Sequence, residues 1–159
     1  MKVLFLDIDG VLNRLPCFDA VAESNTIERE CVGQLNRIIH ATGCKVVLSS
    51  AWRYMVHGKA MTRQGFAYML RTHGATAELD IVGCTAKDEE VTGRAAQVES
   101  WLYDRKRGKN AVSNWCCVDD KADLVGDMPQ EQCHVTNGGS GLTEIDASRI
   151  IHILNRETL

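Results

Sequence analysis

The sequence has no long hydrophobic run, no excess of basic residues and no paired-cysteine motif. A membrane-spanning helix needs roughly 18 consecutive apolar residues, and no segment approaches that length. The apolar run at the N-terminus is short and contains Asp7, which is unlike the core of a signal peptide. We therefore expect a cytoplasmic protein with no membrane contact. The formal net charge of -3 excludes a module held on nucleic acid by bulk positive charge, although an enzyme that contacts one strand end remains compatible with it.

The seven cysteines match neither a disulfide framework nor a zinc site. Their number is odd, they are scattered along the chain, and none forms a Cys-x-x-Cys pair. Most lie in apolar stretches, so we expect reduced thiols that fill the core. The chain also lacks internal repeats and low-complexity segments. Its length of 159 residues, with 45% hydrophobic and 25% charged residues, predicts one globular domain over residues 1–159.

Short apolar runs alternate with segments of helical periodicity about five times. The runs that predict strands are 2–6, 45–48, 79–82, 111–118 and 132–136. This alternation predicts an α/β fold, a three-layer Rossmann-like arrangement with a mostly parallel sheet and helices on both faces. Right-handed crossovers then bring the carboxyl ends of the strands to one edge of the sheet.

Polar residues mark the expected starts of the helices. Asn25 and Glu28 have the spacing of a capping box, and Gly43 is placed to end that helix. A further helix is predicted from Thr62 to His73, and Thr92 and Thr143 are placed to cap the two helices after it. The segment 54–61 is predicted to be irregular.

Two carboxylates follow the first predicted strand, at Asp7 and Asp9, and Gly10 permits a sharp turn directly after them. Taken alone, Asp-x-Asp-Gly is more typical of a solvated turn. Two further strands also end in polar residues, Ser49-Ser50 after the second and Asp119-Asp120 after the fourth. The serines taken alone are as compatible with a helix cap as with a phosphate contact.

These polar residues are expected to meet because the carboxyl ends of parallel strands share one edge. Several carboxylates in one place repel one another unless a cation lies between them, and a set of oxygen ligands suits Mg²⁺. A hydroxyl group with Arg53 or Arg94 nearby suits a phosphoryl group. The sequence therefore predicts a magnesium and phosphate site at this edge.

The same motifs resemble those of the haloacid dehalogenase-like (HAD) phosphohydrolase superfamily, and the resemblance covers the whole chain. The first motif matches Phe5-Leu6-Asp7-Ile8-Asp9-Gly10-Val11, the second Val46-Val47-Leu48-Ser49, and the fourth Cys117-Val118-Asp119-Asp120. The third motif, a basic residue near the start of a helix, fits Arg94, with Lys87 as the alternative. The sequences of these motifs are also similar to those of the HAD domains of RNA-repair (Swiss Army Knife) proteins.

The resemblance implies a phosphatase mechanism. Asp7 would form an aspartyl-phosphate, and Asp9 would act as general acid and then general base. Ser49 and the third-motif cation would hold phosphoryl oxygens. Mg²⁺ would be held by Asp7, the carbonyl of Asp9 and Asp119, with Asp120 either as a further ligand or bonded to one of the ligands. The presence of the second acid favours a phosphatase over a dehalogenase.

The spacing of the motifs leaves little or no room for a cap domain. About forty residues separate Asp9 from Ser49 and a similar number separate Ser50 from Arg94. An open site fits a bulky substrate such as a phosphorylated nucleic-acid end, a nucleotide or a phosphoprotein. Aromatic and basic side chains after the second strand could grip a nucleotide, namely Trp52, Arg53, Tyr54 and His57, although core packing explains Trp52 equally well.

Other interpretations stay open. The basic residues at 105–109 suit either a solvated helix end or a nucleic-acid contact, and the glycine-rich segment 137–141 is typical of a plain loop. A response-regulator receiver also presents aspartates on parallel strands, but no lysine follows the last predicted strand. A degenerate family member that only binds ligands or partners, or a phosphatase of a small metabolite, is the remaining alternative.

Overall fold

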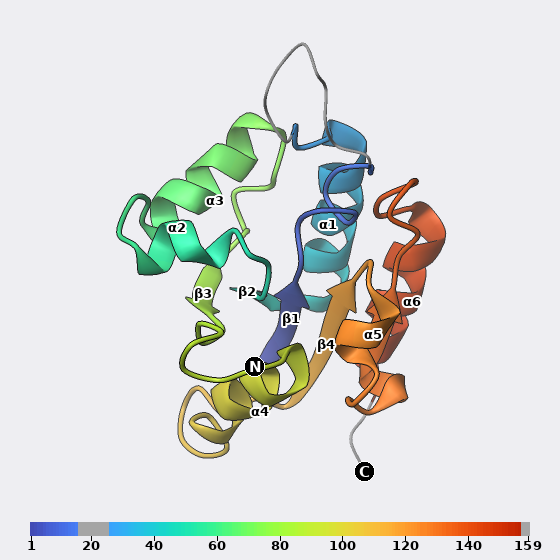
Figure 1. Cartoon of the computed structure of the whole chain (residues 1–159). Helices are drawn as coiled ribbons and strands as arrows, with labels where there is room; N and C mark the ends of the chain where they lie inside the picture. The colour runs from blue at the N-terminus through green and yellow to red at the C-terminus, as the bar shows by residue number, and fades with distance from the viewer. Residues whose placement is uncertain (16–25, 157–159) are drawn as a thin grey trace.

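The structure, a computed structural model, describes residues 1–15 and 26–156. Its sheet has five strands in the order β3-β2-β1-β4-β5, and every pair is parallel. The strands are β1 (Lys2–Leu6), β2 (Lys45–Leu48), β3 (Ile81–Cys84), β4 (Asn114–Asp119) and β5 (Cys133–Val135). This arrangement confirms the predicted parallel sheet (Figure 1). Since β1 and β4 are neighbours at its centre, the residues that follow Leu6 and Val118 lie side by side.

Helices cover both faces of the sheet, as predicted. They are α1 (Arg29–Thr42), α2 (Arg53–His57), α3 (Arg63–Thr72), α4 (Arg94–Tyr103), α5 (Ala122–Val125) and α6 (Glu144–Asn155), with one 3-10 turn, η1 (Gln130–Gln132). Buried residues of α1, α3 and α6 pack in one hydrophobic cluster, and residues of α4 and α5 pack in a second cluster on the other face. In the described residues no large insertion interrupts this order, which agrees with the expected absence of a cap.

The central strand β1 is apolar at almost every position because both of its faces are covered. Successive side chains alternate between the faces, so Leu4 and Leu6 enter the cluster with α1 and α6. Phe5 points to the other face, where its ring packs edge-on against Trp101 and Trp115, with centroid distances of 5.4 and 5.9 Å. All four apolar residues from Val3 to Leu6 are fully buried. The strand that leads into Asp7 is therefore held rigidly from both sides.

Several predicted boundaries differ from the structure. Helix α1 begins at Arg29, and Asn25, the expected cap, lies outside the described residues. Glu28 makes no capping bond, because its carboxylate accepts the Arg14 N–H at 2.9 Å. The prediction of irregular structure for residues 54–61 is wrong for the first half of that segment, where α2 forms.

Other helices and strands also begin at residues that differ from the predicted ones. Thr92 does not cap α4, since Gly93 with φ +90° precedes the helix and the Thr92 hydroxyl donates to the Asp88 carbonyl at 3.3 Å. Strand β3 begins at Ile81, two residues later than predicted, and β4 begins at Asn114, three residues later than predicted.

Other sequence signals are confirmed. Thr62 caps α3 by accepting the Gly65 N–H at 2.9 Å. Thr143 and Asp146 form a capping box at the start of α6. Gly43 ends α1 in the left-handed conformation, with φ +64°. The six cysteines in the described ranges are free and wholly or partly buried, whereas Cys17 lies outside those ranges. None of the helices formed by residues 1–15 and 26–156 has the length and apolarity needed to cross a membrane.

Candidate active site

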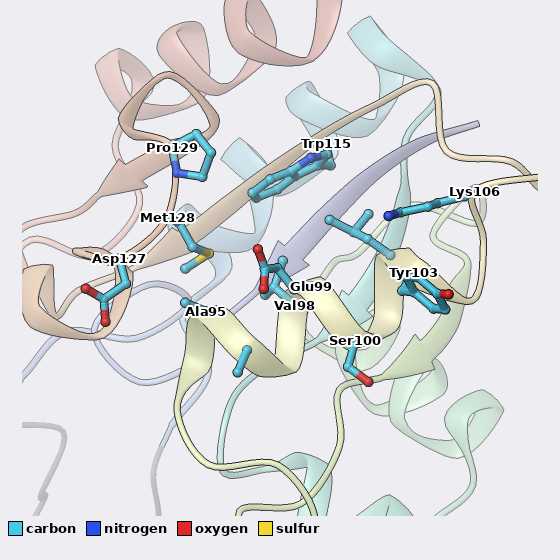
Figure 2. Close-up of a pocket in the computed structure, with 12 residues that line it drawn as sticks. Ala95, Val98, Glu99, Ser100, Tyr103, Lys106, Trp115, Asp127, Met128 and Pro129 are labelled. Atoms are coloured by element: carbon cyan, nitrogen blue, oxygen red, sulfur yellow. The ribbon is translucent and has the colours of Figure 1, made fainter.

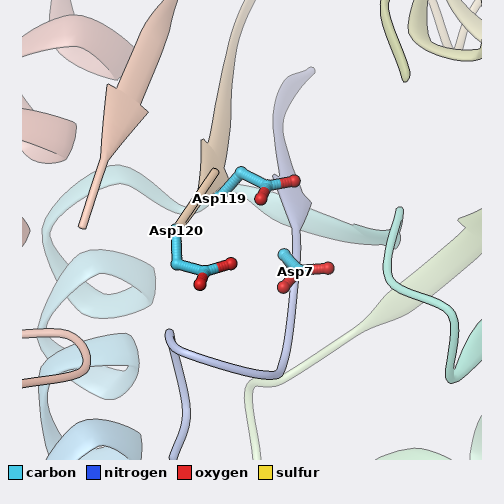
Figure 3. Close-up of side chains that lie close together, drawn as sticks. All are labelled: Asp7, Asp119 and Asp120. Atoms are coloured by element: carbon cyan, nitrogen blue, oxygen red, sulfur yellow. The ribbon is translucent and has the colours of Figure 1, made fainter. Parts of the chain in front are cut away.

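Three aspartates gather at the carboxyl ends of β1 and β4 (Figure 3). Asp7 directly follows β1, while Asp119 ends β4 and Asp120 comes next. Each contributes a carboxylate oxygen to a group whose members all lie within 4.8 Å of one another. The sheet sets this geometry, since the Asp7 N–H donates to the Val118 carbonyl at 3.1 Å. Asp7 and Asp119 are buried and Asp120 is half-buried.

Arg94, the first residue of α4, reaches two of these acids. Its Nη2 lies 3.4 Å from Asp7 Oδ1, and its Nη1 lies 3.1 Å from Asp119 Oδ2. Asp119 Oδ2 is buried and accepts no hydrogen bond from the described residues. Its contact with Arg94 is therefore an ion pair without hydrogen-bond geometry. The described contacts of Lys87 are backbone bonds to Glu90 and Val91. Of these two candidate cations, Arg94 is thus the one that contacts the aspartates.

Burial disfavours the ionised form of two of the aspartates. Burial raises the pKa of Asp7 to about 7, nearby Asp119 adds to this effect, and Arg94 opposes it. Burial also raises the pKa of Asp119, against the opposing effects of Arg94 and the Lys121 N–H. The guanidinium of Arg94 therefore does not cancel the effect of burial on the pKa of Asp7 and Asp119, and further positive charge would favour their ionised forms.

The cluster fits a divalent cation. Its donors are oxygens only, which is the ligand set that Mg²⁺ prefers, and the buried Asp119 Oδ2 has a lone pair to offer. Close packing fixes the third acid, because a Cβ on Gly10 would lie 2.6 Å from Asp120 Cβ and Cγ. Gly10 also has φ +79°, a conformation that glycine adopts without strain. The side chain of Asp9 does not belong to this group of three.

The two serines after β2 differ in their surroundings. Ser49 is fully buried, its N–H donates to the Leu6 carbonyl at 3.0 Å, and its hydroxyl has no hydrogen-bond partner among the described residues. The Ser50 hydroxyl accepts the Trp52 backbone N–H at 3.2 Å. A buried hydroxyl without a partner costs free energy, so the Ser49 hydroxyl still has a donor to offer.

A cleft of about 270 Å³ opens onto the three aspartates. It brings together most of the residues that the sequence assigned to the site. The described residues that line it are Asp7, Asp9, Leu15, Ser50, Ala51, Arg94, Asp119, Asp120, Lys121 and Leu124. Ser49 and Arg53 are not among them.

With this geometry in place, comparison with known families shows that residues 3–147 match the HAD domain in Swiss Army Knife RNA repair proteins. The chain belongs to this family. No curated protein and no solved structure matches the chain. The family assignment confirms the resemblance seen in the motifs, and the buried acidic cluster is compatible with the magnesium site of a HAD domain.

Arg53 of this HAD domain is committed to internal bonds. Its side chain is buried, and Nη1 donates to the Ser49 carbonyl at 3.0 Å. Nε and Nη2 donate to the Ala86 carbonyl and to Asp88 Oδ1, each at 3.1 Å. Arg53 thus connects the end of β2 to the segment that leads from β3 into α4. Since that segment precedes Arg94, these bonds help to position the cation of the site.

Two side chains of the HAD domain contact Asp9, and the sequence analysis expected neither contact. Trp52 Nε1 donates to Asp9 Oδ2 at 3.0 Å, and Asn13 Nδ2 donates to Asp9 Oδ1 at 2.9 Å. Asn13 follows the Asp-Gly turn, where asparagine commonly bonds to nearby groups, so a local signal was present. Trp52 lies 43 residues from Asp9, and nothing in the sequence pattern predicts that contact.

A larger hollow of about 600 Å³ lies between α4 and β4 (Figure 2). Its walls are mostly apolar and include Val98, Trp115 and Met128. The charged groups around it come from separate segments and do not converge on one point; they are Glu99, Lys106 and Asp127. The smaller cleft, where the acids meet, is therefore the candidate site of this HAD domain.

Proposed function

We propose that this HAD domain is a Mg²⁺-dependent phosphomonoesterase that works through an aspartyl-phosphate on Asp7. The observation that carries the proposal is the convergence of Asp7, Asp9 and Arg94 with the Asp119–Asp120 pair on one cleft. A nucleophile, a second acid, a cation and a metal-compatible acid cluster are the groups that phosphoryl transfer by this route requires.

In the first step, a carboxylate oxygen of Asp7 attacks phosphorus and the bond from phosphorus to the leaving oxygen breaks. Asp9 gives its proton to that oxygen. In the second step, water attacks the phosphorus of the aspartyl-phosphate and gives a proton to Asp9. The bond to Asp7 then breaks, which releases inorganic phosphate and restores both side chains.

The other residues of the cleft have electrostatic roles. Mg²⁺ held by Asp7, Asp119, Asp120 and the Asp9 carbonyl would supply positive charge against the repulsion between Asp7 and an anionic substrate. Arg94 would orient Asp7 and stabilise non-bridging phosphoryl oxygens. The Ser49 hydroxyl, buried without a partner, would donate to one of these oxygens. The bonds of Arg53 to its neighbours favour a structural role over a phosphate contact.

Phosphorylated nucleic-acid ends or nucleotides are the substrates that we propose. Two observations support this choice. The family occurs in RNA repair proteins, and in the described residues no large insertion covers the cleft, which suits a bulky substrate.

The experiment is an assay of phosphate release with and without Mg²⁺ for the wild type and Asp7→Asn. Oligonucleotides phosphorylated at the 3′ or the 5′ end, nucleoside monophosphates, a phosphopeptide, a sugar phosphate and an activated aryl phosphate are compared. We expect Mg²⁺-dependent release that Asp7→Asn abolishes, with the highest kcat/KM for a nucleic-acid end or nucleotide. Absence of release from all of them, together with retained Mg²⁺-dependent binding of a phosphate mimic, would contradict an enzyme and indicate a binding domain.

A further inference from the structure

Among the described residues, two side chains donate an N–H to the carboxylate of Asp9, one to each oxygen. Trp52 Nε1 lies 3.0 Å from Oδ2, and Asn13 Nδ2 lies 2.9 Å from Oδ1. The two donors come from different parts of the chain, Asn13 from the loop after β1 and Trp52 from the turn after β2. Asp9 itself lines the cleft beside Asp7. The carboxylate is therefore bonded from two sides while it still faces the cleft.

Both donors are themselves held in place. Asn13 is almost fully buried, and its Oδ1 accepts the Gly10 N–H at 2.8 Å. The Gly10 carbonyl in turn accepts the Thr136 hydroxyl at 2.9 Å. The indole ring of Trp52 packs edge-on against Phe66, with 6.0 Å between ring centroids. Neither donor has to be ordered when substrate binds.

Asp9 is attached by two rotatable bonds, and a free aspartate side chain samples several rotamers. Proton transfer is efficient only when the acid lies within hydrogen-bond reach of the leaving oxygen. One N–H on each oxygen fixes the plane of the carboxylate, so the acid is held in one orientation. A half-buried indole N–H can bond to solvent at its polar edge, yet this one is directed at the second acid of the cleft.

We propose that Trp52 and Asn13 are positioning residues that hold the Asp9 carboxylate in the orientation needed for proton transfer to the leaving group. This inference rests on the proposed function, because it assigns these residues to the proton-transfer part of the same reaction. It gives Trp52 a role distinct from stacking on a nucleotide.

The test compares two substrates that differ in their need for a proton. A ribose or alkyl phosphate has a basic leaving oxygen, whereas nitrophenolate leaves from an aryl phosphate without protonation. Trp52→Phe keeps the aromatic ring and removes the N–H. We expect kcat on the ribose phosphate to fall about tenfold with KM unchanged, and kcat on the aryl phosphate to fall much less. Asn13→Ser, which is too short to reach Asp9, should show the same substrate-selective loss.

A double-mutant cycle shows whether Trp52 acts through Asp9. In an Asp9→Asn background, Trp52→Phe should cause no additional loss on the ribose phosphate. Trp115→Phe is the matched control, since it makes the same change in a tryptophan that packs against Phe5 on the face of α4 and α5. It should leave the ratio of the two activities unchanged.

The outcomes separate this inference from the proposed function. Equal losses on both substrates in Trp52→Phe and Asn13→Ser, or losses that multiply with that of Asp9→Asn, would overturn the positioning role while the phosphatase stands. A wild type without turnover, or an Asp7→Asn variant with full turnover, would overturn the proposed function and this inference with it.

Discussion

Arg94 and Asp7 form a buried ion pair, with 3.4 Å between Nη2 and Oδ1 and side chains that are only 8% and 10% exposed. The two residues are 87 positions apart, and the pair joins the start of α4 to the end of β1. Since the same guanidinium also reaches Asp119, it links two of the three clustered acids. Removing one partner of such a pair leaves the other buried charges uncompensated.

Arg94→Ala should therefore lower kcat/KM by about 10²- to 10³-fold, the size of effect seen when one transition-state donor is lost. Arg94→Lys should recover only part of this activity, because a single ammonium group lacks the planar fork that spans both acids. Steady-state kinetics at saturating Mg²⁺ measures kcat/KM for both Arg94 variants. Arg149→Ala, an exposed arginine on α6, is the control and should match the wild type. Wild-type kinetics in Arg94→Ala would contradict the role of this residue.

The raised pKa of Asp7 predicts a pH-dependent stability in the absence of metal. Asp7 titrates at about 7 in the folded protein against 3.8 in the unfolded chain. The stabilisation associated with its protonated form is complete below pH 4 and is lost as the pH rises to about 7. Asp7→Asn removes this loss. In EDTA the variant should equal the wild type near pH 4 and exceed it above pH 7, by at most about 4 kcal/mol.

Denaturant unfolding at several pH values, with and without Mg²⁺, tests this expectation. Adding Mg²⁺ at pH 8 should stabilise the wild type more than Asp7→Asn, because the metal binds the ionised carboxylate of the folded state. Glu99→Gln, a change at an exposed acid on α4, should show neither effect. Equal stability of the wild type and Asp7→Asn at every pH would show that burial does not strain the carboxylate.

Local sequence patterns predicted much of this fold correctly, because each pattern has a direct physical reason. The run from Val3 to Leu6 predicted a strand buried on both faces, and a parallel sheet brought the end of that strand beside Asp119 and Asp120. The cap at Thr143 was correct because both capping partners lie within four residues. The short helix α2 was missed, since five residues are too few for a helical period to emerge.

Site residues that directly follow a strand could be predicted from the sequence. Site residues whose positions depend on tertiary contacts could not. Asp7 and the Asp119–Asp120 pair were placed by the sheet alone. Arg53 and Arg94 were both plausible phosphate ligands, and only tertiary contacts distinguish the arginine that bonds to Asp88 from the one that faces the aspartates. The bond from Trp52 to Asp9 depends on how two loops pack together, which no local pattern reports.

The Mg²⁺ concentration needed for activity should depend on the individual aspartates of the cluster. Asp120→Asn removes one anionic oxygen ligand and should raise the Mg²⁺ concentration for half-maximal activity at least tenfold, while kcat at saturating Mg²⁺ falls less. Asp123→Asn is the matched control because Asp123 is exposed in α5, three residues further on. Titration of activity with Mg²⁺ separates the two variants. Identical Mg²⁺ curves for Asp120→Asn and the wild type would exclude Asp120 as a ligand.

Gly10 and Gly33 provide a matched pair that tests how tightly the site is packed. A Cβ on Gly10 would meet Asp120 at 2.6 Å in a backbone conformation with φ +79°. Gly10→Ala should therefore lower the free energy of unfolding by more than about 2 kcal/mol and weaken Mg²⁺ binding by displacing Asp120. Gly33 lies exposed inside α1 with no atom within 4 Å of the added Cβ, so Gly33→Ala should stabilise the protein by about 0.5–1 kcal/mol.

Denaturant unfolding and Mg²⁺ titration of both glycine variants give the readout. The opposite signs expected for the same chemical change separate crowding at the site from the general effect of replacing glycine. If Gly10→Ala kept the stability and the Mg²⁺ affinity of the wild type, the close contact between the turn after β1 and Asp120 would be excluded. The geometry proposed for the third acid of the cluster would then have to be abandoned, because Gly10 is what leaves room for it.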